Sequence, residues 1–182
     1  KIRLVTEANL NDEQKDFLSQ FFYDKLNGSV NPIWLSEIED LTVLEDNRIY
    51  LIVEKCEKKD NKKKYAIVKV PDRIYGRWVK IPSSDGFDNI MYLDDVIRYC
   101  LPLVFLGFKE STYRAYSFKF TKDAEMEMDN DADFGTMEKI ALGVNSRKKG
   151  EAVRVIYDHE MPREMQRKLR DRLNRSEERR VG

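Results

Sequence analysis

The chain has 182 residues, and its 33 Lys and Arg residues balance its 33 Asp and Glu residues, so its formal net charge is zero. This length is usual for one domain, and the hydrophobic share of 41% is enough for a packed core. Neutrality argues against a protein that coats nucleic acid, and two cysteines with a single histidine argue against a zinc site or a disulfide framework.

The first predicted element is a helix over residues 11–26. Its apolar residues recur at spacings of three and four and define one helical face: Phe17, Leu18, Phe21, Phe22 and Leu26. Asn11 is the expected N-cap, and the Asn-Gly pair at 27–28 is expected to end the helix. Residues 29–44 show few periodic signals, which predicts an irregular connection.

The next segments predict strands. Residues 48–57 and 64–70 are rich in β-branched and aromatic side chains, and the charged segment 58–63 lies between them. This pattern is typical of a β-hairpin with a solvated tip. Two further short strands are expected at 77–81 and 90–93.

A second helix is expected to begin with Asp94 or Asp95 as its N-cap and to run to about residue 105. Pro102 lies inside this segment, so the helix should end or kink early. Alternating side chains over residues 112–121 then predict another strand.

The last third predicts an acidic loop at 125–133, a helix over 134–148, a strand over 151–157 and a final helix that opens at Pro162. Strands and helices mix without strict β-α-β alternation. The expected class is therefore α+β, with a mixed, mainly antiparallel sheet, a hairpin and packed helices. No run approaches the roughly 20 apolar residues that a membrane span needs.

Few residues suggest catalysis. His159 could transfer a proton or accept a phosphate, but an exposed histidine flanked by acids at a strand end is the simpler interpretation. The motifs of P-loop, dinucleotide-binding and serine-hydrolase sites are missing from the sequence. Two groups of aspartates could bind a divalent cation, although the first is more simply a helix cap: Asp94 with Asp95, and Asp129 with Asp131 and Asp133. We therefore assign no catalytic residue and no metal site.

Basic residues are the better candidates for a binding site. Arg73, Arg77 and Lys80 flank one predicted strand, Lys119 lies near the end of another, and Arg154 lies in a third. Their charged groups could converge on a polyanion such as a phosphate chain. The alternative is that they lie on solvated faces of a chain in which 36% of the residues are charged.

Several phrases resemble, in the same order, the large polyphosphate kinases that work through a phosphohistidine. The resemblance extends over roughly residues 10–173, and its most specific phrases are 65–71 (Tyr-Ala-Ile-Val-Lys-Val-Pro), 77–82 (Arg-Trp-Val-Lys-Ile-Pro), 92–99 (Tyr-Leu-Asp-Asp-Val-Ile-Arg-Tyr), 116–124 (Tyr-Ser-Phe-Lys-Phe-Thr-Lys-Asp-Ala) and 147–154 (Arg-Lys-Lys-Gly-Glu-Ala-Val-Arg).

This resemblance implies a function for the longer enzyme. The family transfers the terminal phosphate of ATP reversibly to polyphosphate with Mg²⁺, and its catalytic residues lie in C-terminal domains that match no position here. The chain resembles the head domain, which in this family supports dimerisation and shapes the polyphosphate tunnel. We expect ATP and Mg²⁺ to bind elsewhere in the enzyme and not to this segment. Polyphosphate and a second copy of the enzyme, in a dimer or larger homo-oligomer, are the expected partners, in the cytoplasm or in a membrane-associated complex.

The resemblance also implies domain boundaries. Residues 1–6 would end an N-terminal domain, and residues 7–174 would form the head (middle) domain. Within it, residues 162–174 would lead toward C-terminal domains. Residues 175–182 do not continue the family pattern, and we expect them to be a non-native tail.

Two other hypotheses stay open at this point. The chain could be a stand-alone polyanion-binding α+β module that uses the five basic residues, or a small α+β enzyme that uses His159 with an aspartate. A head domain separated from its neighbours predicts an exposed apolar patch.

Overall fold

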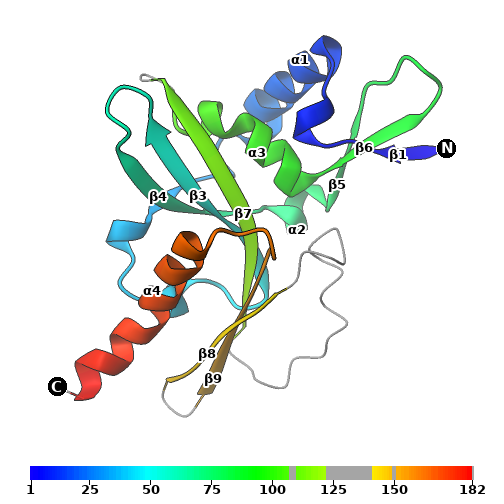
Figure 1. The fold of residues 1–182 in the computed structure, drawn as a ribbon. Coiled ribbons are helices and arrows are strands. Elements are labelled where there is room, and N and C mark those ends of the chain that lie inside the picture. The colour runs from blue at the N-terminus through cyan, green and yellow to red at the C-terminus, as the bar shows by residue number, and fades with distance from the viewer. Residues whose placement is uncertain (107–109, 122–140, 149–150, 182) are drawn as a thin grey trace.

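The strands of residues 1–106, 110–121, 141–148 and 151–181, which the computed structural model describes, form two sheets (Figure 1). The smaller sheet has the order β1-β6-β5, and it comprises β1 (Ile2–Leu4), β5 (Trp78–Ile81) and β6 (Asp88–Tyr92). The larger sheet has the order β2-β4-β3-β7-β9-β8, and it comprises β2 (Ile33–Trp34), β3 (Arg48–Glu57), β4 (Lys63–Lys69), β7 (Ser111–Thr121), β8 (Ala141–Lys148) and β9 (Glu151–Tyr157). Only the β1–β6 pair among these strands is parallel.

The helices of the described residues are α1 (Asp12–Phe21), which continues as a π-helical turn (Phe22–Leu26), α2 (Asp72–Tyr75), α3 (Leu93–Val104) and α4 (Arg163–Val181). Short 3₁₀ turns lie at Glu7–Asn9, Leu35–Glu37 and Leu41–Val43. Together with the two sheets, these helices confirm the predicted α+β class. None of the helices in this part of the chain is long and apolar enough to cross a membrane.

The predicted cap of the first helix is confirmed. The Asn11 side chain accepts a hydrogen bond from the Gln14 backbone N–H at 2.8 Å, and the Gln14 side chain accepts one from the Asn11 N–H at 3.0 Å. This reciprocal capping box satisfies two N–H groups that have no partner within the helix. Gln14 also donates to the Pro82 carbonyl, which joins α1 to the end of β5.

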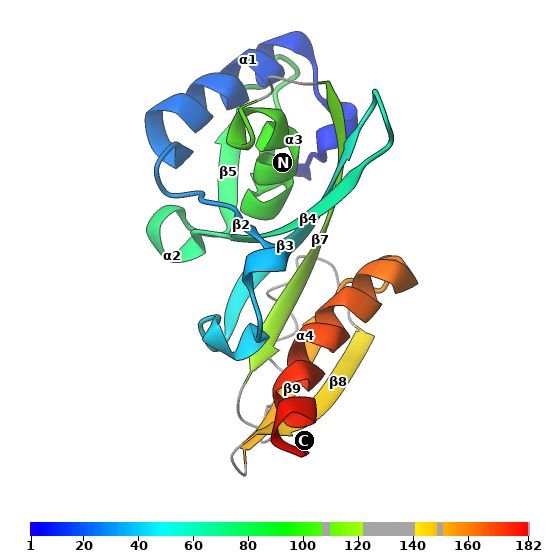
Figure 2. The same ribbon diagram turned by 90° about the vertical axis from the view of Figure 1, so that its left-hand side faces the viewer.

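Strand β3 lies inside the larger sheet and is buried on both faces. Ile49, Leu51 and Val53 belong to one hydrophobic cluster, and Tyr50 and Ile52 belong to a second one. Residues of α1 and α3 complete the first cluster, and residues of α4 complete the second. The two views place α1 and α3 on one side of β3 and β7, and α4 on the other (Figures 1 and 2). The sheet therefore separates two cores.

One predicted helix is wrong. Within the described part of the segment 134–148, residues 141–148 form β8, which pairs antiparallel with β9; residues 134–140 lie outside the described residues. A strand here satisfies its backbone groups by pairing with β9, and Gly143 already disfavours a helix. The acidic segment 125–133 also lies outside the described residues.

Smaller differences concern segment ends. The connection over 29–44 contains the short strand β2, which adds an edge to the larger sheet by pairing with β4. Helix α3 continues two residues past Pro102, so the proline lies in its last turn. Helix α4 begins one residue after Pro162 and includes most of the segment 175–182. A non-native origin of that segment stays a prediction.

Because the second cluster depends on large side chains from the sheet, Phe118→Ala should lower the free energy of unfolding by about 3–5 kcal/mol. Phe118 is fully buried, and its ring stacks against Tyr50 with centroids 5.7 Å apart. Val43→Ala is the control, because Val43 is 73% exposed and should change stability by less than about 0.5 kcal/mol. Equal urea midpoints for the two variants would contradict this core assignment.

Candidate functional site

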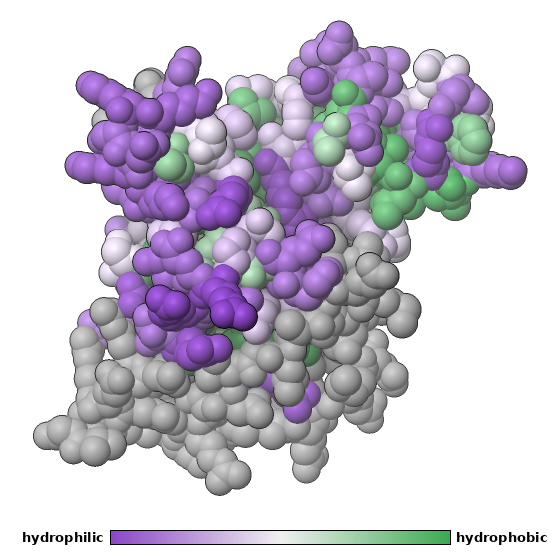
Figure 3. Space-filling model, in the orientation of Figure 1, coloured by the Kyte–Doolittle hydropathy of each residue, from purple (hydrophilic) through white to green (hydrophobic). Residues whose placement is uncertain are grey.

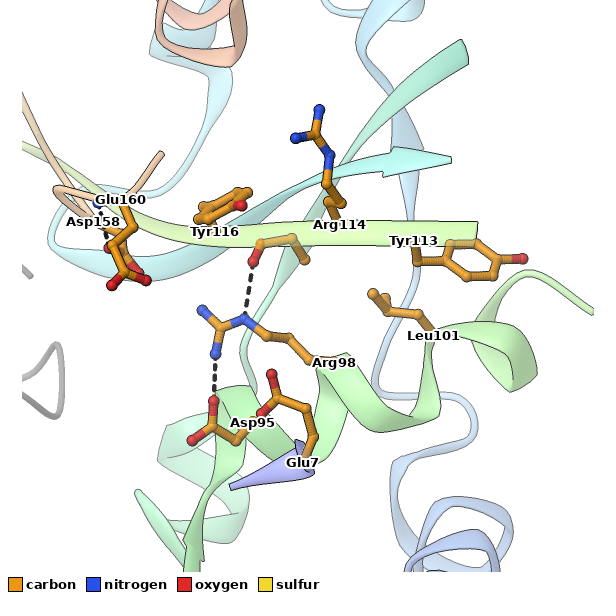
Figure 4. Close-up of a pocket in the computed structure, with 10 residues that line it drawn as sticks. Glu7, Asp95, Arg98, Leu101, Tyr113, Arg114, Tyr116, Asp158 and Glu160 are labelled. Atoms are coloured by element: carbon orange, nitrogen blue, oxygen red, sulfur yellow. Dashed lines mark hydrogen bonds and ion pairs between the residues drawn. The ribbon is translucent and has the colours of Figure 1, made fainter. Parts of the chain in front are cut away.

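A cleft of about 340 Å³ opens between α3, β7 and the residues that follow β9 (Figure 4). Its charged lining comprises four carboxylates and two guanidinium groups: Glu7, Asp95, Asp158 and Glu160, with Arg98 and Arg114. The cleft is therefore acidic, and it does not suit a polyanion. We call it the acidic cleft.

Arg98 links the two sides of the acidic cleft. Its side chain leaves α3 and is only 10% exposed; Nε donates to the Ala115 carbonyl of β7 at 2.9 Å, and Nη2 donates to Ser117 Oγ at 2.8 Å. On its own helix, Nη1 donates to Asp95 Oδ1 at 2.6 Å and lies 3.5 Å from Asp94 Oδ2. Burial disfavours the charged form of Arg98, but the two carboxylates outweigh it and raise the pKa of Arg98.

Asp94 and Asp95 are buried in the first turn of α3. The expectation that one of them caps the helix is wrong, because the N-cap is Tyr92, without a side-chain cap. Asp94 and Asp95 lie four and three residues before Arg98, on the same helical face. Their negative charges near the helix N-terminus also interact favourably with the helix dipole. Asp94 further accepts from Ser117 Oγ at 3.1 Å and lies 3.7 Å from Arg77 Nη2. These carboxylates are thus engaged by cations of the chain itself.

A second charged pair joins β3 to β7. The guanidinium of Arg114 donates to both carboxylate oxygens of Glu54, at 3.0 and 2.9 Å, and Tyr65 Oη donates to the same carboxylate at 2.9 Å. Glu54 and Arg114 are direct partners in the strand register. Burial tends to raise the pKa of Glu54, but the bonds from Arg114 and Tyr65 outweigh it and hold the pKa below its ordinary value.

Three of the five predicted cations lie in the smaller sheet or in the residues just before β5. Arg73 is exposed on α2. Arg77 is mostly buried, pairs with Asp94 and lies over the Tyr92 ring at 5.6 Å. Lys80 is exposed on β5, and its Nζ lies 3.4 Å from Asp88 Oδ1.

The other two predicted cations lie in the larger sheet. Lys119 on β7 is only 1% exposed, and Arg154 on β9 is partly buried. Lys119 is the register partner of Ile156, and Thr121 is the partner of Arg154, so both cations point to the same face of the sheet. The structure therefore brings these two together, and polyphosphate binding by the set of five stays a prediction.

His159 matches the simpler of its two interpretations. Its side chain is 46% exposed, and its Nδ1 lies 3.8 Å from the Asp158 carboxylate, beyond hydrogen-bond distance. Asp158 is buried at the end of β9, and its carboxylate accepts from the Glu160 N–H. Within the described residues, no group of three or more His, Cys, Asp or Glu side chains could hold a metal ion.

One face of the smaller sheet is open and carries several apolar side chains together with the exposed Lys80–Asp88 ion pair. Register partners share a face, so Ile2, Leu4, Trp78 and Tyr92 lie on the side opposite to the buried Met91. Ile2 is 73% exposed, and Trp78 is 50% exposed and contacts the Tyr92 ring at 4.3 Å. Hydrophobic residues gather where β1, β5 and β6 lie, on the right of Figure 3. We call this surface the open sheet face.

Comparisons with known proteins agree with one another. Residues 13–181 match the family described as the polyphosphate kinase middle domain. The chain is 33% identical over 169 residues to the polyphosphate kinase of Vibrio parahaemolyticus and 30% identical over 177 residues to that of Escherichia coli K12, covering 91% and 95% of the chain. It spans about a quarter of the length of these relatives, 24% and 25%.

A solved structure resembles most of the chain. The crystal structure of polyphosphate kinase from Porphyromonas gingivalis superposes with a TM-score of 0.67 at 28% sequence identity. The superposition covers 95% of this chain and 24% of that one. The likeness therefore concerns one segment of a much longer protein.

The ion pair of Glu54 should make the free energy of unfolding depend on pH. A carboxylate whose folded pKa is depressed stabilises the fold above its unfolded pKa and loses this contribution as pH falls. Glu54→Gln should therefore cost roughly 1–2 kcal/mol at pH 7, because a charged hydrogen-bond acceptor is lost beside a half-exposed arginine. The difference from the unaltered chain should shrink below the ordinary Glu value of 4.5.

Urea unfolding at several pH values measures this difference. Glu110→Gln is the control, because Glu110 is exposed and should give no pH-dependent difference. A Glu54→Gln deficit that stays constant from pH 7 to pH 3 would contradict the assigned ion pair.

Proposed function

Because the chain belongs to the polyphosphate kinase family and matches its middle domain, we propose that it is the head domain of an ATP-polyphosphate phosphotransferase. The reaction of the longer enzyme would be ATP + polyphosphate(n) ⇌ ADP + polyphosphate(n+1), with Mg²⁺. The match over residues 13–181 is the observation that carries this proposal.

In this proposal the head domain supports catalysis without performing it. The ion pairs and hydrogen bonds of its carboxylates are consistent with such a role. Asp94 and Asp95 are bound by Arg98, and Glu54 is held by Arg114 and Tyr65, so these carboxylates serve the fold. A catalytic acid or base instead needs to reach a proton of the substrate. ATP, Mg²⁺ and the phosphorylated group would then lie in other parts of the enzyme.

The open sheet face supports a role in dimerisation. Aromatic side chains are typical anchors of protein interfaces, and Trp78 of the edge strand β5 lies beside Tyr92 of the central strand β6 on this face. A monomer rarely leaves such a surface uncovered. We propose that the face packs against a second copy of the enzyme, and that Arg73, which is exposed on the neighbouring helix α2, contributes to the path of polyphosphate.

A chimeric enzyme tests this function. The segment of the Escherichia coli enzyme that aligns with this chain is replaced by residues 1–174, and two quantities are measured: ATP-dependent polyphosphate synthesis and the mass in solution by light scattering. The chimera should synthesise polyphosphate as a dimer. Trp78→Glu in the chimera should yield monomers with little synthesis, because a buried unpaired carboxylate opposes association.

The control in the same chimera is Val43→Glu, an exposed apolar position away from the open sheet face, which should leave mass and synthesis unchanged. The present chain alone, with ATP, Mg²⁺ and polyphosphate, should transfer no phosphate. Phosphate transfer by the chain alone would overturn the non-catalytic role, and a dimeric, active Trp78→Glu chimera would overturn the assigned interface.

A further inference from the structure

A second hollow, of about 480 Å³, lies between the edge of the larger sheet at β2 and β4 and the helix α4. Its charge is opposite to that of the acidic cleft. Four cationic side chains and one carboxylate, that of the exposed Glu37, line it. The four cations are Lys63, Lys64, Lys168 and Arg172. We call this hollow the basic groove; strongly hydrophilic residues lie on this side of the molecule, from the hairpin tip to α4 (Figure 3).

Two aromatic rings hold lysines at the basic groove. The Lys64 ammonium lies over the Trp34 ring, 5.1 Å from its centroid, and the Lys168 ammonium lies over the Tyr65 ring at 4.4 Å. A cation over an aromatic face is attracted by the ring quadrupole. Since lysine side chains are otherwise free to rotate, these contacts reduce the entropy that a ligand must remove when it binds.

The walls of the basic groove are themselves fixed. Tyr65 Oη lies 2.9 Å from a carboxylate oxygen of Glu54 and 3.0 Å from one of Glu164 on α4, and its single proton serves these two acceptors, so its ring is held between strand and helix. The Nε of Arg172 donates to the Leu35 carbonyl at 3.2 Å, which ties α4 to the 3₁₀ turn after β2. The groove is thus largely formed before any ligand binds.

The lysines keep their positive charge available. Among the residues that the structure describes, no carboxylate oxygen lies within 4.0 Å of the ammonium groups of Lys63, Lys64 or Lys168. Of the two nearby carboxylates, Glu54 is paired with Arg114 and also interacts at longer range with Lys63, and Glu164 accepts from Tyr65 Oη. A concave surface lined by one sign of charge concentrates the field and attracts ions of the opposite sign.

We propose that the basic groove binds a linear phosphate chain, outside the catalytic part of the enzyme. The identity of this ligand as polyphosphate rests on the proposed function. Phosphate oxygens accept strong charge-assisted hydrogen bonds from ammonium and guanidinium groups. Lysine binds as a point charge without fixed geometry, which suits a repeating chain that can shift by one unit without losing its contacts.

The aromatic residues favour a phosphate chain over a nucleotide or RNA. Base recognition uses an open ring face on which a base can stack. The Trp34 ring instead contacts the Lys64 ammonium and, at 5.5 Å between centroids, the ring of Phe105. The Tyr65 ring carries the Lys168 ammonium. These rings therefore position cations and leave little room for a base.

Binding of linear polyphosphate to the 182-residue chain, measured by calorimetry, tests the proposal. The variant Lys64→Glu with Lys168→Glu should weaken binding by about a hundredfold, because two charge-assisted contacts of roughly tenfold each become repulsive or are lost. The matched control is Lys58→Glu with Lys59→Glu at the exposed hairpin tip, which changes the net charge equally outside the groove. It should change affinity by less than about threefold, since the exposed tip is screened by salt.

Three results would overturn the proposal: no binding by the unaltered chain, equal weakening by the two double variants, or equally tight binding of single-stranded RNA. The milder pair Lys64→Gln with Lys168→Gln should give the same order of effect, so a folding defect of the Glu variant leaves the test intact. Synthesis by the chimera is a separate readout. An active chimera together with a chain that does not bind polyphosphate would refute the basic groove and leave the proposed function standing.

Discussion

The fold depends on the buried guanidinium of Arg98, which joins helix α3 to the larger sheet. Helix α3 directly follows β6, so its position also sets the position of the smaller sheet. Arg98 bonds to two carboxylates on its own helix and to the Ala115 carbonyl and Ser117 hydroxyl of β7. Arg77, just before β5, reaches Asp94 in the same cluster. One group of buried charges therefore links the two sheets, and removing a single member would leave the others unpaired.

Because β3 is buried on both faces, helices cover both sides of the larger sheet, and the two hollows lie beside different helices. Helices α1 and α3 occupy one side of the sheet, and α4 occupies the other. The acidic cleft lies beside α3, whereas the basic groove lies beside α4. A chain with zero net charge thus presents two hollows of opposite sign, which its composition alone does not reveal.

Sequence patterns correctly predicted the features that depend on residues close to one another in the chain. The cap at Asn11 and the β3–β4 hairpin are confirmed, because both depend on neighbours within a few residues. The strand β8 was not predictable in this way, since its hydrogen bonds come from β9 and the helical pattern of the sequence is weak. The role of Asp94 and Asp95 was also missed. Their spacing from Arg98 was visible in the sequence, but the acceptors on β7 that complete the cluster were not.

The candidate sites, too, could be predicted only in part, because they depend on contacts between distant segments. Sequence reasoning selected cations by their position on predicted strands, and it could not distinguish the exposed Lys80 from the buried Lys119. The basic groove was missed, because its residues come from three distant segments, 34–37, 63–65 and 168–172. Only the pairing of β2 with β4 and the docking of α4 bring them together.

A double-mutant cycle on Arg98 and Asp95 tests the central claim most directly. The free energy of urea unfolding is measured for Arg98→Met, Asp95→Asn and the double variant. Because each single change leaves a buried partner unpaired, Arg98→Met alone should cost about 3–5 kcal/mol. The double variant should be more stable than the sum of the single losses implies, by at least about 1 kcal/mol. Additive losses, or a cost of Arg98→Met below about 1 kcal/mol, would contradict a fold that depends on this buried charge cluster.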